Sequence, residues 1–306
     1  MPKFSIIIPC FNAAETLADT LQSIRDQTLQ DWEAICIDDG STDDTRMIVL
    51  SAGKDDERIK LAYNPGKGPS AARNFGAEFM ARGSIISFCD ADDIWSARKL
   101  TEVAAFFDKT GCDATFGQIA FFEQKPSDAR VFSTVPKQAL TMNDLLAENP
   151  VCTMSNVSIR KTALLRFGWF DETVVYNEDL EWLVRIVGQG AKVLGQRSQQ
   201  VWYRKSPNGL SSNLAAMKAG RKAAIKTALQ FGARPSRQSN AIYQRYLARR
   251  ALRMGHGRML ALKLALLGVA QSPRGFMSPP RRGALTLLGA LANFFLPRPI
   301  ARAVFS

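Results

Sequence analysis

Strand-like and helix-like patterns alternate through the first hundred residues, and this alternation restricts the chain to a small set of folds. The apolar runs that are typical of buried strands are residues 5–9, 32–37, 59–63 and 84–89. Helical patterns occupy residues 14–26 and 69–80, and residues 41–44 supply an N-cap and an acidic first turn for a further helix. This alternation predicts an α/β fold with a mostly parallel sheet flanked by helices.

Carboxylates follow two of these strands at the point where each strand ends. Asp38 and Asp39 follow the second apolar run, and Asp90 follows the fourth. In parallel α/β sheets, ligands bind at the carboxyl ends of the strands. We therefore expect a binding site with acidic side chains at this edge of the sheet.

Residues 112–205 carry a mixed pattern, and from about residue 215 the chain becomes helical and cationic. Within the mixed part we expect strands at residues 115–122 and 192–202 and helices at residues 141–148 and 178–187. Two later apolar stretches, residues 259–270 and 284–296, are too short for a spanning helix, which needs roughly 20 apolar residues. We predict a first domain at residues 1–210 and a basic, partly amphipathic helical region at residues 211–306.

Charge is divided unevenly between the two parts of the chain. The net charge is +12, yet the last acidic residue is Glu181. Residues 1–181 carry 18 Lys and Arg against 28 Asp and Glu, whereas residues 182–306 carry 22 Lys and Arg and no acid. Such a segment favours contact with nucleic acid, an anionic membrane or a phosphorylated substrate, and a solvated basic tail is the alternative. The short apolar stretches favour helices in a membrane interface, with ordinary core helices as the alternative.

Five cysteines are scattered through the chain without a CxxC pair. This spacing argues against a zinc site or a disulfide framework and fits a reducing compartment. The chain begins directly with a strand-like run and shows no secretory signal pattern. We expect a cytoplasmic protein that lies peripherally on the inner face of the cell membrane.

The densest acidic cluster is Asp90-Ala91-Asp92-Asp93, which directly follows a strand. Neighbouring carboxylates repel one another unless a cation lies between them, and Mg²⁺ and Mn²⁺ prefer oxygen ligands. The alternative is an acidic turn that caps a helix at residues 94–107. The segment from Asp38 to Asp44 presents the same choice, because it suits either contact with a nucleoside or the start of a helix.

Several common sites are absent from the sequence. The segment Gly66-Lys67-Gly68-Pro69 lacks the spacing of a Walker A loop, and no GxGxxG motif follows the first strand. The single histidine, His256, leaves no basis for a histidine metal cluster or a Ser-His-Asp triad.

Five motifs together carry a resemblance to a known family. They are Ser5-Ile6-Ile7-Ile8-Pro9-Cys10-Phe11-Asn12, Asp38-Asp39-Gly40-Ser41-Thr42-Asp43, Ala72-Arg73-Asn74-Phe75-Gly76, Asp90-Ala91-Asp92-Asp93, and Phe170-Asp171-Glu172 with Glu178-Asp179. In this order and spacing the chain resembles the inverting family 2 glycosyltransferases of GT-A fold over roughly residues 4–205. Phe11 stands where the family more often has tyrosine.

The resemblance implies a role for each matching position. It implies that the nucleotide-sugar donor is bound by Pro9, Phe11, Asn12, Glu15, Asp39, Arg73 and Asp90. It also implies that Asp92, with Asp90, binds a divalent Mn or Mg ion, and that Asp179, beside Glu178, is the catalytic general base. A helix N-terminus stabilised by two acids is the alternative for the last pair.

The implied reaction is sugar transfer with inversion onto a hydroxyl of a glycan, such as a polyprenyl-diphosphate-linked or polysaccharide acceptor. Assembly of bacterial envelope polysaccharide is the setting that the resemblance implies. An inactive nucleotide-sugar-binding module and a nucleic-acid-binding protein are the alternatives. We expect no nucleic-acid partner, because few aromatic residues are interleaved with the arginines of the basic region.

Overall fold

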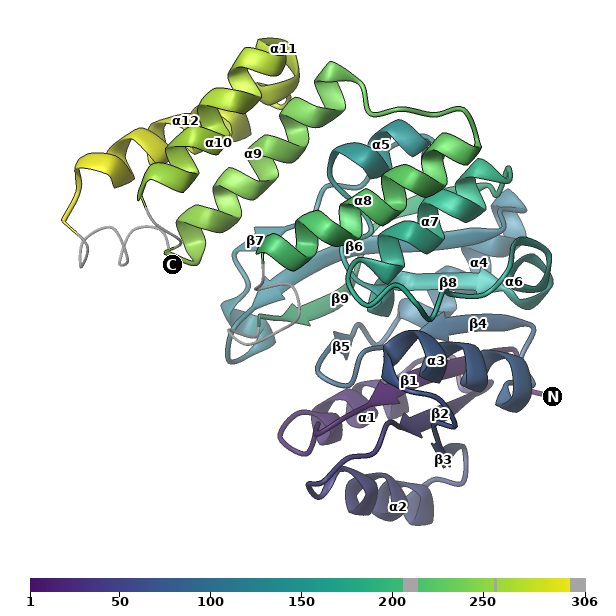
Figure 1. Ribbon diagram of the computed structural model, residues 1–306. Coiled ribbons are helices and arrows are strands. Elements are labelled where there is room, and N and C mark those ends of the chain that lie inside the picture. The colour runs from purple at the N-terminus through teal and green to yellow at the C-terminus, as the bar shows by residue number, and fades with distance from the viewer. Residues whose placement is uncertain (206–213, 256–257, 298–306) are drawn as a thin grey trace. The chain divides into compact units, whose positions relative to one another are not determined.

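The computed structural model describes residues 1–205, 214–255 and 258–297 (Figure 1). The chain divides into two compact units. The first unit comprises Met1–Leu140 and Pro150–Pro207, and the second comprises Thr141–Asn149 and Asn208–Ser306. The predicted boundary at residues 210 and 211 and the single histidine, His256, lie outside the described residues. The sequence pattern did not predict that segment 141–149 belongs with the second unit.

The first unit contains one mixed sheet and helices. Its strands are β1 (Phe4–Cys10), β2 (Trp32–Asp38), β3 (Ile59–Tyr63), β4 (Ile85–Phe88), β5 (Ile94–Trp95), β6 (Ala114–Phe122), β7 (Val131–Phe132), β8 (Val157–Arg160) and β9 (Val193–Arg204). Its α-helices are α1 (Leu17–Arg25), α2 (Thr45–Asp55), α3 (Gly68–Phe75), α4 (Lys99–Thr110), α6 (Lys161–Phe167) and α7 (Glu178–Gly188). The short turns are η1 (Gly76–Met80), which is π-helical, and the 3₁₀ turns η2 (Pro126–Asp128) and η3 (Met154–Asn156).

The strand order is β3-β2-β1-β4-β8-β6-β9-β5, with β7 paired to β6. Strands β1, β2, β3 and β4 are parallel, as the alternating pattern predicts. Strand β8 is antiparallel to both β4 and β6, whereas β6 and β9 are parallel. The chain leaves β1 toward β2 and β3 on one side and returns to β4 on the other. Such a reversal opens a crevice for ligands at the carboxyl ends of the strands.

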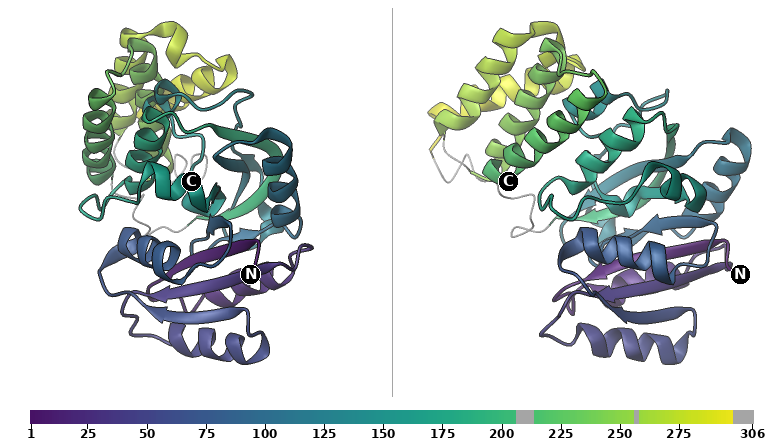
Figure 2. Two further views of the ribbon diagram at one scale, coloured as in Figure 1. Left: turned by 90° about the vertical axis from the view of Figure 1, so that its right-hand side faces the viewer. Right: turned by 45° about the vertical axis from the view of Figure 1, so that its right-hand side comes forward.

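Helices cover both faces of this sheet (Figure 2). The fully buried Ile6 and Ile8 of β1 share a core with apolar residues of α1, α2 and α4. Ile7 points to the opposite face, because side chains alternate along a strand. There it meets η1, where a Cβ atom added to Gly76 would lie 2.7 Å from a methyl carbon of Ile7. A glycine is therefore required for the close approach of η1 to the sheet.

The helix predicted at residues 94–107 is wrong at its beginning. Ile94 and Trp95 form strand β5, which pairs with β9, and helix α4 begins only at Lys99. Trp95 is 2% exposed, and its Nε1 donates a hydrogen bond to the backbone oxygen of Ser155 at 3.0 Å. Partners distant in sequence therefore override the local helical pattern.

The acidic first turn predicted for the second helix is also wrong. Helix α2 begins at Thr45 and has no acidic residue in its first turn. Asp43 lies before the helix, where its carboxylate accepts hydrogen bonds from the backbone nitrogens of Thr45 at 3.1 Å and Ala14 at 3.0 Å.

Strand β8 was not predicted from the sequence, because its four residues carry too short a pattern.

The second unit is helical, as predicted for the cationic part of the chain. Its helices are α5 (Met142–Ala147), α8 (Leu214–Gln230), α9 (Arg237–Arg253), α10 (Arg258–Gln271), α11 (Pro273–Phe276) and α12 (Pro280–Phe295). Helix α10 packs against both α9 and α12 (Figure 1). Tyr243 and Leu247 of α9 and Phe276 of α11 contribute to a core that belongs to this unit alone.

Over the stretches that the structure describes, each helix is either too short or too polar to cross a bilayer. The five cysteines all fall within these stretches and are free thiols, four of them buried and Cys152 exposed.

Candidate active site

The carboxyl ends of three neighbouring strands bring the predicted residues to one edge of the sheet. Phe11 follows β1, Asp39 follows β2, and Asp90 lies two residues beyond β4. Because β1 lies between β2 and β4 in a parallel arrangement, these three positions share an edge. The backbone nitrogen of Asp39 also donates a hydrogen bond to the backbone oxygen of Cys10 at 2.8 Å.

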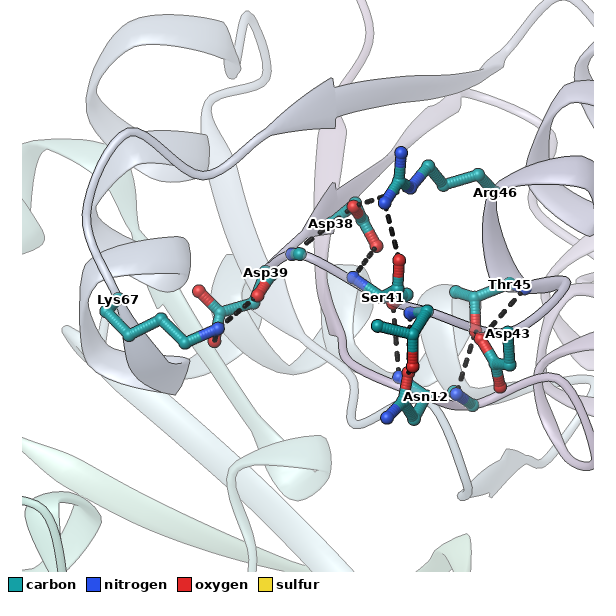
Figure 3. Close-up of polar contacts among 11 residues, drawn as sticks. Asn12, Asp38, Asp39, Ser41, Asp43, Thr45, Arg46 and Lys67 are labelled. Carbon is teal, nitrogen blue, oxygen red and sulfur yellow. Dashed lines mark hydrogen bonds and ion pairs between the residues drawn. The ribbon is translucent and has the colours of Figure 1, made fainter.

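The loops after β1 and β2 are joined by hydrogen bonds (Figure 3). The backbone nitrogen of Asn12 donates to Ser41 Oγ at 3.1 Å, and Asn12 Oδ1 accepts from the backbone nitrogen of Thr42 at 2.9 Å. Asn12 has a φ of 47°, in the left-handed region that asparagine tolerates better than most residues. The side-chain oxygen of Asn12 thus holds two loops together, while its predicted contact with a donor stays a prediction.

Asp38 and Asp39 are neighbours with different environments (Figure 3). Asp38 is buried, accepts from the backbone nitrogen of Ser41 at 3.1 Å and pairs with Arg46 Nε at 3.1 Å. These contacts close the turn after β2. Asp39 is half-buried, accepts from Asn64 Nδ2 at 2.6 Å and pairs with Lys67 Nζ at 3.4 Å. Asp39, which is predicted to bind the nucleotide-sugar donor, is therefore oriented by two side chains from the segment that follows β3.

Phe11 presents an aromatic face at this edge. Its side chain is 55% exposed, and Lys67 Nζ lies 4.7 Å from the centroid of its ring. An exposed ring of this kind offers a stacking surface to a nucleotide base. Pro9 is partly buried in β1 and Glu15 is exposed in the loop before α1. The sequence did not predict the contact of Lys67 with Phe11 and Asp39, because the segment around Lys67 matches no motif and lacks the spacing of a Walker A loop.

Arg73 of α3 links two motifs that lie far apart in the sequence. Its side chain is 5% exposed, with Nη2 2.8 Å from Asp90 Oδ1 and Nη1 2.9 Å from Glu178 Oε1. Burial disfavours the charge of this group, but the two carboxylates outweigh burial and raise the pKa of Arg73 above its ordinary value. The motif of Asp90, which is predicted to bind a metal, and the motif of Glu178 and Asp179, which is predicted to supply the base, therefore both pair with the buried guanidinium of Arg73.

Asp90 is held from its other side by the η3 segment. Thr153 Oγ1 donates to Asp90 Oδ2 at 2.8 Å, and the backbone nitrogen of Asp90 donates to Ser155 Oγ at 2.8 Å. Both oxygens of this carboxylate are thus engaged, which orients it firmly. No signal in the sequence marked Thr153 or Ser155, because they lie more than 60 residues away in a segment without a motif.

The two remaining acids of the cluster differ in burial. Asp93 is fully buried, and its Oδ1 accepts from the backbone nitrogen of Arg204 at 3.1 Å. Burial, followed by the charges of Asp92 and Asp90, raises the pKa of Asp93 well above its ordinary value. Asp92 is half-buried, and burial together with the charge of Asp90 raises its pKa to about 6. Asp93 thus anchors β9, while Asp92 is the less buried of the two carboxylates.

These acids fit a divalent ion whose coordination is completed by a ligand. Across residues 1–205, 214–255 and 258–297, no group of three or more His, Cys, Asp or Glu side chains is arranged to hold a metal by itself. Mg²⁺ and Mn²⁺ commonly bind through one or two carboxylates and complete their shell with water and substrate phosphates. Burial and then the charge of Asp90 disfavour the ionised form of Asp92 and raise its pKa, and a bound cation would favour that ionised form.

Asp179 occupies the first turn of α7, next to Glu178. Burial, and then the charge of Glu178, raises the pKa of Asp179 to about 7. A carboxylate with this pKa is a much stronger base than an ordinary aspartate. The same turn thus supplies Glu178 to Arg73 and a carboxylate with raised basicity one residue later.

Asn74 fastens α3 to the segment that precedes α7. Its Nδ2 donates to the backbone oxygen of Phe170 at 2.9 Å, and its Oδ1 accepts from the backbone nitrogen of Phe170 at 2.9 Å. Asn74 Nδ2 also donates to Glu172 Oε1 at 2.8 Å. The ring of Phe170 stacks on Trp182 of α7, with centroids 4.7 Å apart. Adjacent residues of one motif, Arg73 and Asn74, therefore both position the segment that carries Asp179.

A model of glycosyl transferase family 2 matches residues 5–168, which is more than half of the chain. The chain belongs to this family and is a glycosyltransferase. It is 30% identical over 214 residues to TuaG of Bacillus subtilis (strain 168), a glycosyltransferase named for teichuronic acid biosynthesis, covering 69% of this chain and 82% of that protein. A second relative is the UDP-Glc:alpha-D-GlcNAc-diphosphoundecaprenol beta-1,3-glucosyltransferase WfgD of Escherichia coli, 32% identical over 68% of this chain and 79% of that protein.

Solved structures show the same fold at low sequence identity. S. aureus TarS 1–349 in complex with UDP aligns with a TM-score of 0.60 and 17% identity over 99% of this chain and 91% of that chain. The chain spans 54% of the longer TarS crystal structure. The mannosyltransferase PcManGT from Pyrobaculum calidifontis, in complex with GDP-Man and Mn²⁺, aligns with a TM-score of 0.59 and 17% identity over 99% of this chain and 86% of that chain. The fold is GT-A-like, with a helical C-terminal region.

Proposed function

We propose that this glycosyltransferase moves a sugar from a UDP-sugar onto a hydroxyl of an undecaprenyl-diphosphate-linked glycan, with inversion at the anomeric carbon. The names of the relatives support the donor and the acceptor. The observation that carries the mechanism is the buried Arg73, which bonds at once to Asp90 and to Glu178, the neighbour of Asp179. Groups suited to the leaving diphosphate and to the incoming hydroxyl are thereby held in one network.

The donor would bind at the carboxyl edge of β1, β2 and β4. The exposed ring of Phe11 would stack on the base, with Pro9, Asn12 and Glu15 around it. Asp39 would accept a hydrogen bond from the base, because it is half-buried and already oriented by Asn64. Asp90 would accept from a ribose hydroxyl.

Asp92, with Asp90, would hold the Mn²⁺ or Mg²⁺ ion. When bound, such an ion neutralises the charge that develops on the leaving diphosphate. Arg73 is locked between two carboxylates, so its part is to orient Asp90 and to hold positive charge near the donor. The Mn²⁺ bound by PcManGT supports this cofactor for the fold.

Asp179 would accept the proton of the attacking hydroxyl. With its pKa raised to about 7, its basicity is closer to that required for this step than that of an ordinary aspartate. The oxygen then attacks the anomeric carbon from the side opposite the diphosphate, which inverts that centre. Glu178 maintains the raised pKa through its charge and keeps the first turn of α7 attached to Arg73.

We also infer that the reaction takes place at the cytoplasmic face of the membrane. A lipid-linked acceptor is available there, and five free cysteines fit a reducing compartment.

The test is a transfer assay with a panel of UDP-sugars, a synthetic polyprenyl-diphosphate-linked acceptor, and Mn²⁺ or Mg²⁺. We expect metal-dependent UDP release from one donor, loss of release in Asp92→Asn, and no change in Asp108→Asn, which alters an exposed acid outside the site. Binding of UDP by calorimetry without transfer to any lipid-linked acceptor would contradict the proposed acceptor. Absence of both binding and release would contradict the proposed reaction.

A further inference from the structure

The second unit exposes large apolar side chains along helix α12. Leu285 is 60% exposed, Leu288 is 62% exposed and Phe295 is 78% exposed. Their spacing of three and seven residues puts them on one side of the helix, and Leu291, 39% exposed, lies beside them. A monomeric protein in water ordinarily turns such residues inward.

The buried side of α12 is made of small residues. Gly283, Thr286, Gly289 and Ala290 are its buried positions. A Cβ atom added to Gly283 would lie 2.6 Å from the Cα of Met277, so this contact admits no larger side chain. Small residues between helices and large apolar residues outside them are the arrangement found where helices are surrounded by lipid.

Helix α10, which packs against α12, repeats this arrangement in part. Its exposed apolar residues are Met259 at 67%, Leu266 at 53% and Leu267 at 43%. Three of its four buried residues are small: Ala261, Ala265 and Gly268. We call the exposed residues Met259, Leu266 and Leu267 of α10 and Leu285, Leu288, Leu291 and Phe295 of α12 the apolar face.

Basic residues border the apolar face. The exposed Lys263 lies one turn from both Met259 and Leu267 on α10. The exposed Arg281 lies one turn before Leu285 on α12. Long cationic side chains at such positions can rest their aliphatic part on apolar surface and extend their charge to headgroups.

The charge of the second unit identifies the class of surface that it fits. Residues 208–306 contain 17 Lys and Arg and no acid. In segment 141–149, Glu148 is surrounded by cations: it pairs with Arg245 at 3.3 Å, Arg249 at 3.4 Å and Arg282 at 3.7 Å. A unit with this excess is attracted to a negatively charged surface.

We propose that helices α10 and α12 bind the enzyme to an anionic lipid surface, with the apolar face inserted among the headgroups and Lys263 and Arg281 on lipid phosphates. Helix α12 has 16 residues, too few to span a bilayer, which suits a helix that lies along its surface. A second copy of the chain is a poorer occupant, because it would bring the same excess of positive charge to the contact.

The test is sedimentation of the full chain with vesicles of phosphatidylcholine, with and without phosphatidylglycerol. The triple variant Leu285→Ser/Leu288→Ser/Phe295→Ser should lower the partition coefficient on anionic vesicles by more than about tenfold, because three apolar side chains no longer insert. The matched control, Met47→Ser/Leu50→Ser, alters exposed apolar residues of α2 and should bind like the wild type. Lys263→Ser/Arg281→Ser should weaken binding by about fivefold per cation, and added salt should reduce that difference.

Circular dichroism and thermal unfolding would verify that each variant is folded, as expected for substitutions of exposed residues. Membrane binding and sugar transfer are separable, because the vesicles carry no acceptor and UDP release by the triple variant can be measured in their absence. Wild-type binding to anionic vesicles by the triple variant would overturn the proposal. A dimer in analytical ultracentrifugation that becomes a monomer in the triple variant, with unchanged vesicle binding, would assign the apolar face to a second copy.

Discussion

The sheet of the first unit and helix α12 of the second unit place large apolar residues and charges in opposite ways. In the first unit, large apolar residues such as Phe4, Trp95 and Trp182 are buried, and carboxylates gather at one edge of a sheet. In the second unit, α12 buries glycine and alanine, exposes leucine and phenylalanine, and lies in a sequence without carboxylates. The first pattern is that of a domain folded against water, and the second that of helices with one face toward lipid.

The two units also differ in how far their positive charges are compensated by carboxylates. In the first unit, Arg73 is buried between two carboxylates, so its charge is compensated and fixed in place. In the second unit, Glu148 is one acid among three arginines, so positive charge remains in excess. Function in the first unit should therefore be sensitive to single charges, while the second should be sensitive to the size of small residues.

The largest expected effect is on catalysis by the first unit. Asp179→Asn removes the proposed base while keeping the shape of the side chain, and should lower kcat by about a hundredfold to ten-thousandfold. Product formation under saturating donor measures this loss, and thermal unfolding should show that the variant stays folded. The exposed acid change Asp108→Asn serves as the control. A variant at Asp179 with near wild-type turnover would remove this residue from the mechanism.

The next effect is on the stability of the first unit. Arg73→Met leaves the carboxylates of Asp90 and Glu178 without their shared cation, and should cost about 3 kcal/mol of unfolding free energy. Arg98→Met is the matched control, since Arg98 is 74% exposed and pairs with Glu102 at 3.7 Å. Loss of that surface pair should cost less than about 0.5 kcal/mol. Equal losses of unfolding free energy in the two variants, measured by chemical denaturation, would show that the buried ion pairs of Arg73 stabilise the fold no more than the exposed pair of Arg98.

The pH dependence should follow Asp179. Its pKa is raised to about 7, so turnover should fall about tenfold for each pH unit below 7 as the base becomes protonated. Stability should change in the opposite sense. Between about pH 4 and pH 7 the folded carboxyl holds a proton that the unfolded chain has released, so this group favours folding at the lower pH.

Both pH profiles, of turnover and of unfolding free energy, should be compared with those of Asp179→Asn. The contribution of this group to the slope of stability should disappear in the variant. A wild-type turnover profile that stays flat from pH 5 to pH 8 would contradict a base with the pKa of Asp179.

The smallest expected effect contrasts the inside and the outside of α12. Gly283→Ala places a methyl group 2.6 Å from the Cα of Met277 and the backbone oxygen of Phe276, and should destabilise the second unit by about 1–2 kcal/mol. Leu285→Ala removes a larger group from an exposed position and should change stability by less than about 0.5 kcal/mol. Thermal unfolding in the absence of lipid measures both. A larger loss of stability for Leu285→Ala than for Gly283→Ala would contradict the arrangement in which α12 buries small residues and exposes large apolar ones.

Local patterns in the sequence sufficed for much of the first unit. The predicted strand at residues 59–63 coincides with β3, and the parallel order of β1, β2 and β4 follows from strand and helix alternation. The edge that carries Asp39 and Asp90 follows from the same rule, because the residues after parallel strands meet on one side.

Elements that depend on distant partners were not predictable in this way. Residues 94–95 read as the start of a helix, yet they form a strand because β9 supplies its hydrogen bonds. Thr153, which fixes the carboxylate of Asp90, carries no local mark of that role. The sequence likewise did not predict that α10 and α12 bury small residues and expose large apolar ones, because composition does not reveal which side of a helix is buried.

By itself the sequence determined the fold class, the family motifs and the separation of acidic and basic parts, since each depends on residue type and on spacing along the chain. The tertiary structure decided which charges are shared and which apolar residues stay outside. Arg73 meets Asp90 and Glu178 from 17 and 105 residues away, and Gly283 meets Met277 through the turn between α11 and α12. The physical reason is that desolvation and close packing are properties of three-dimensional neighbours, which periodicity along the chain does not specify.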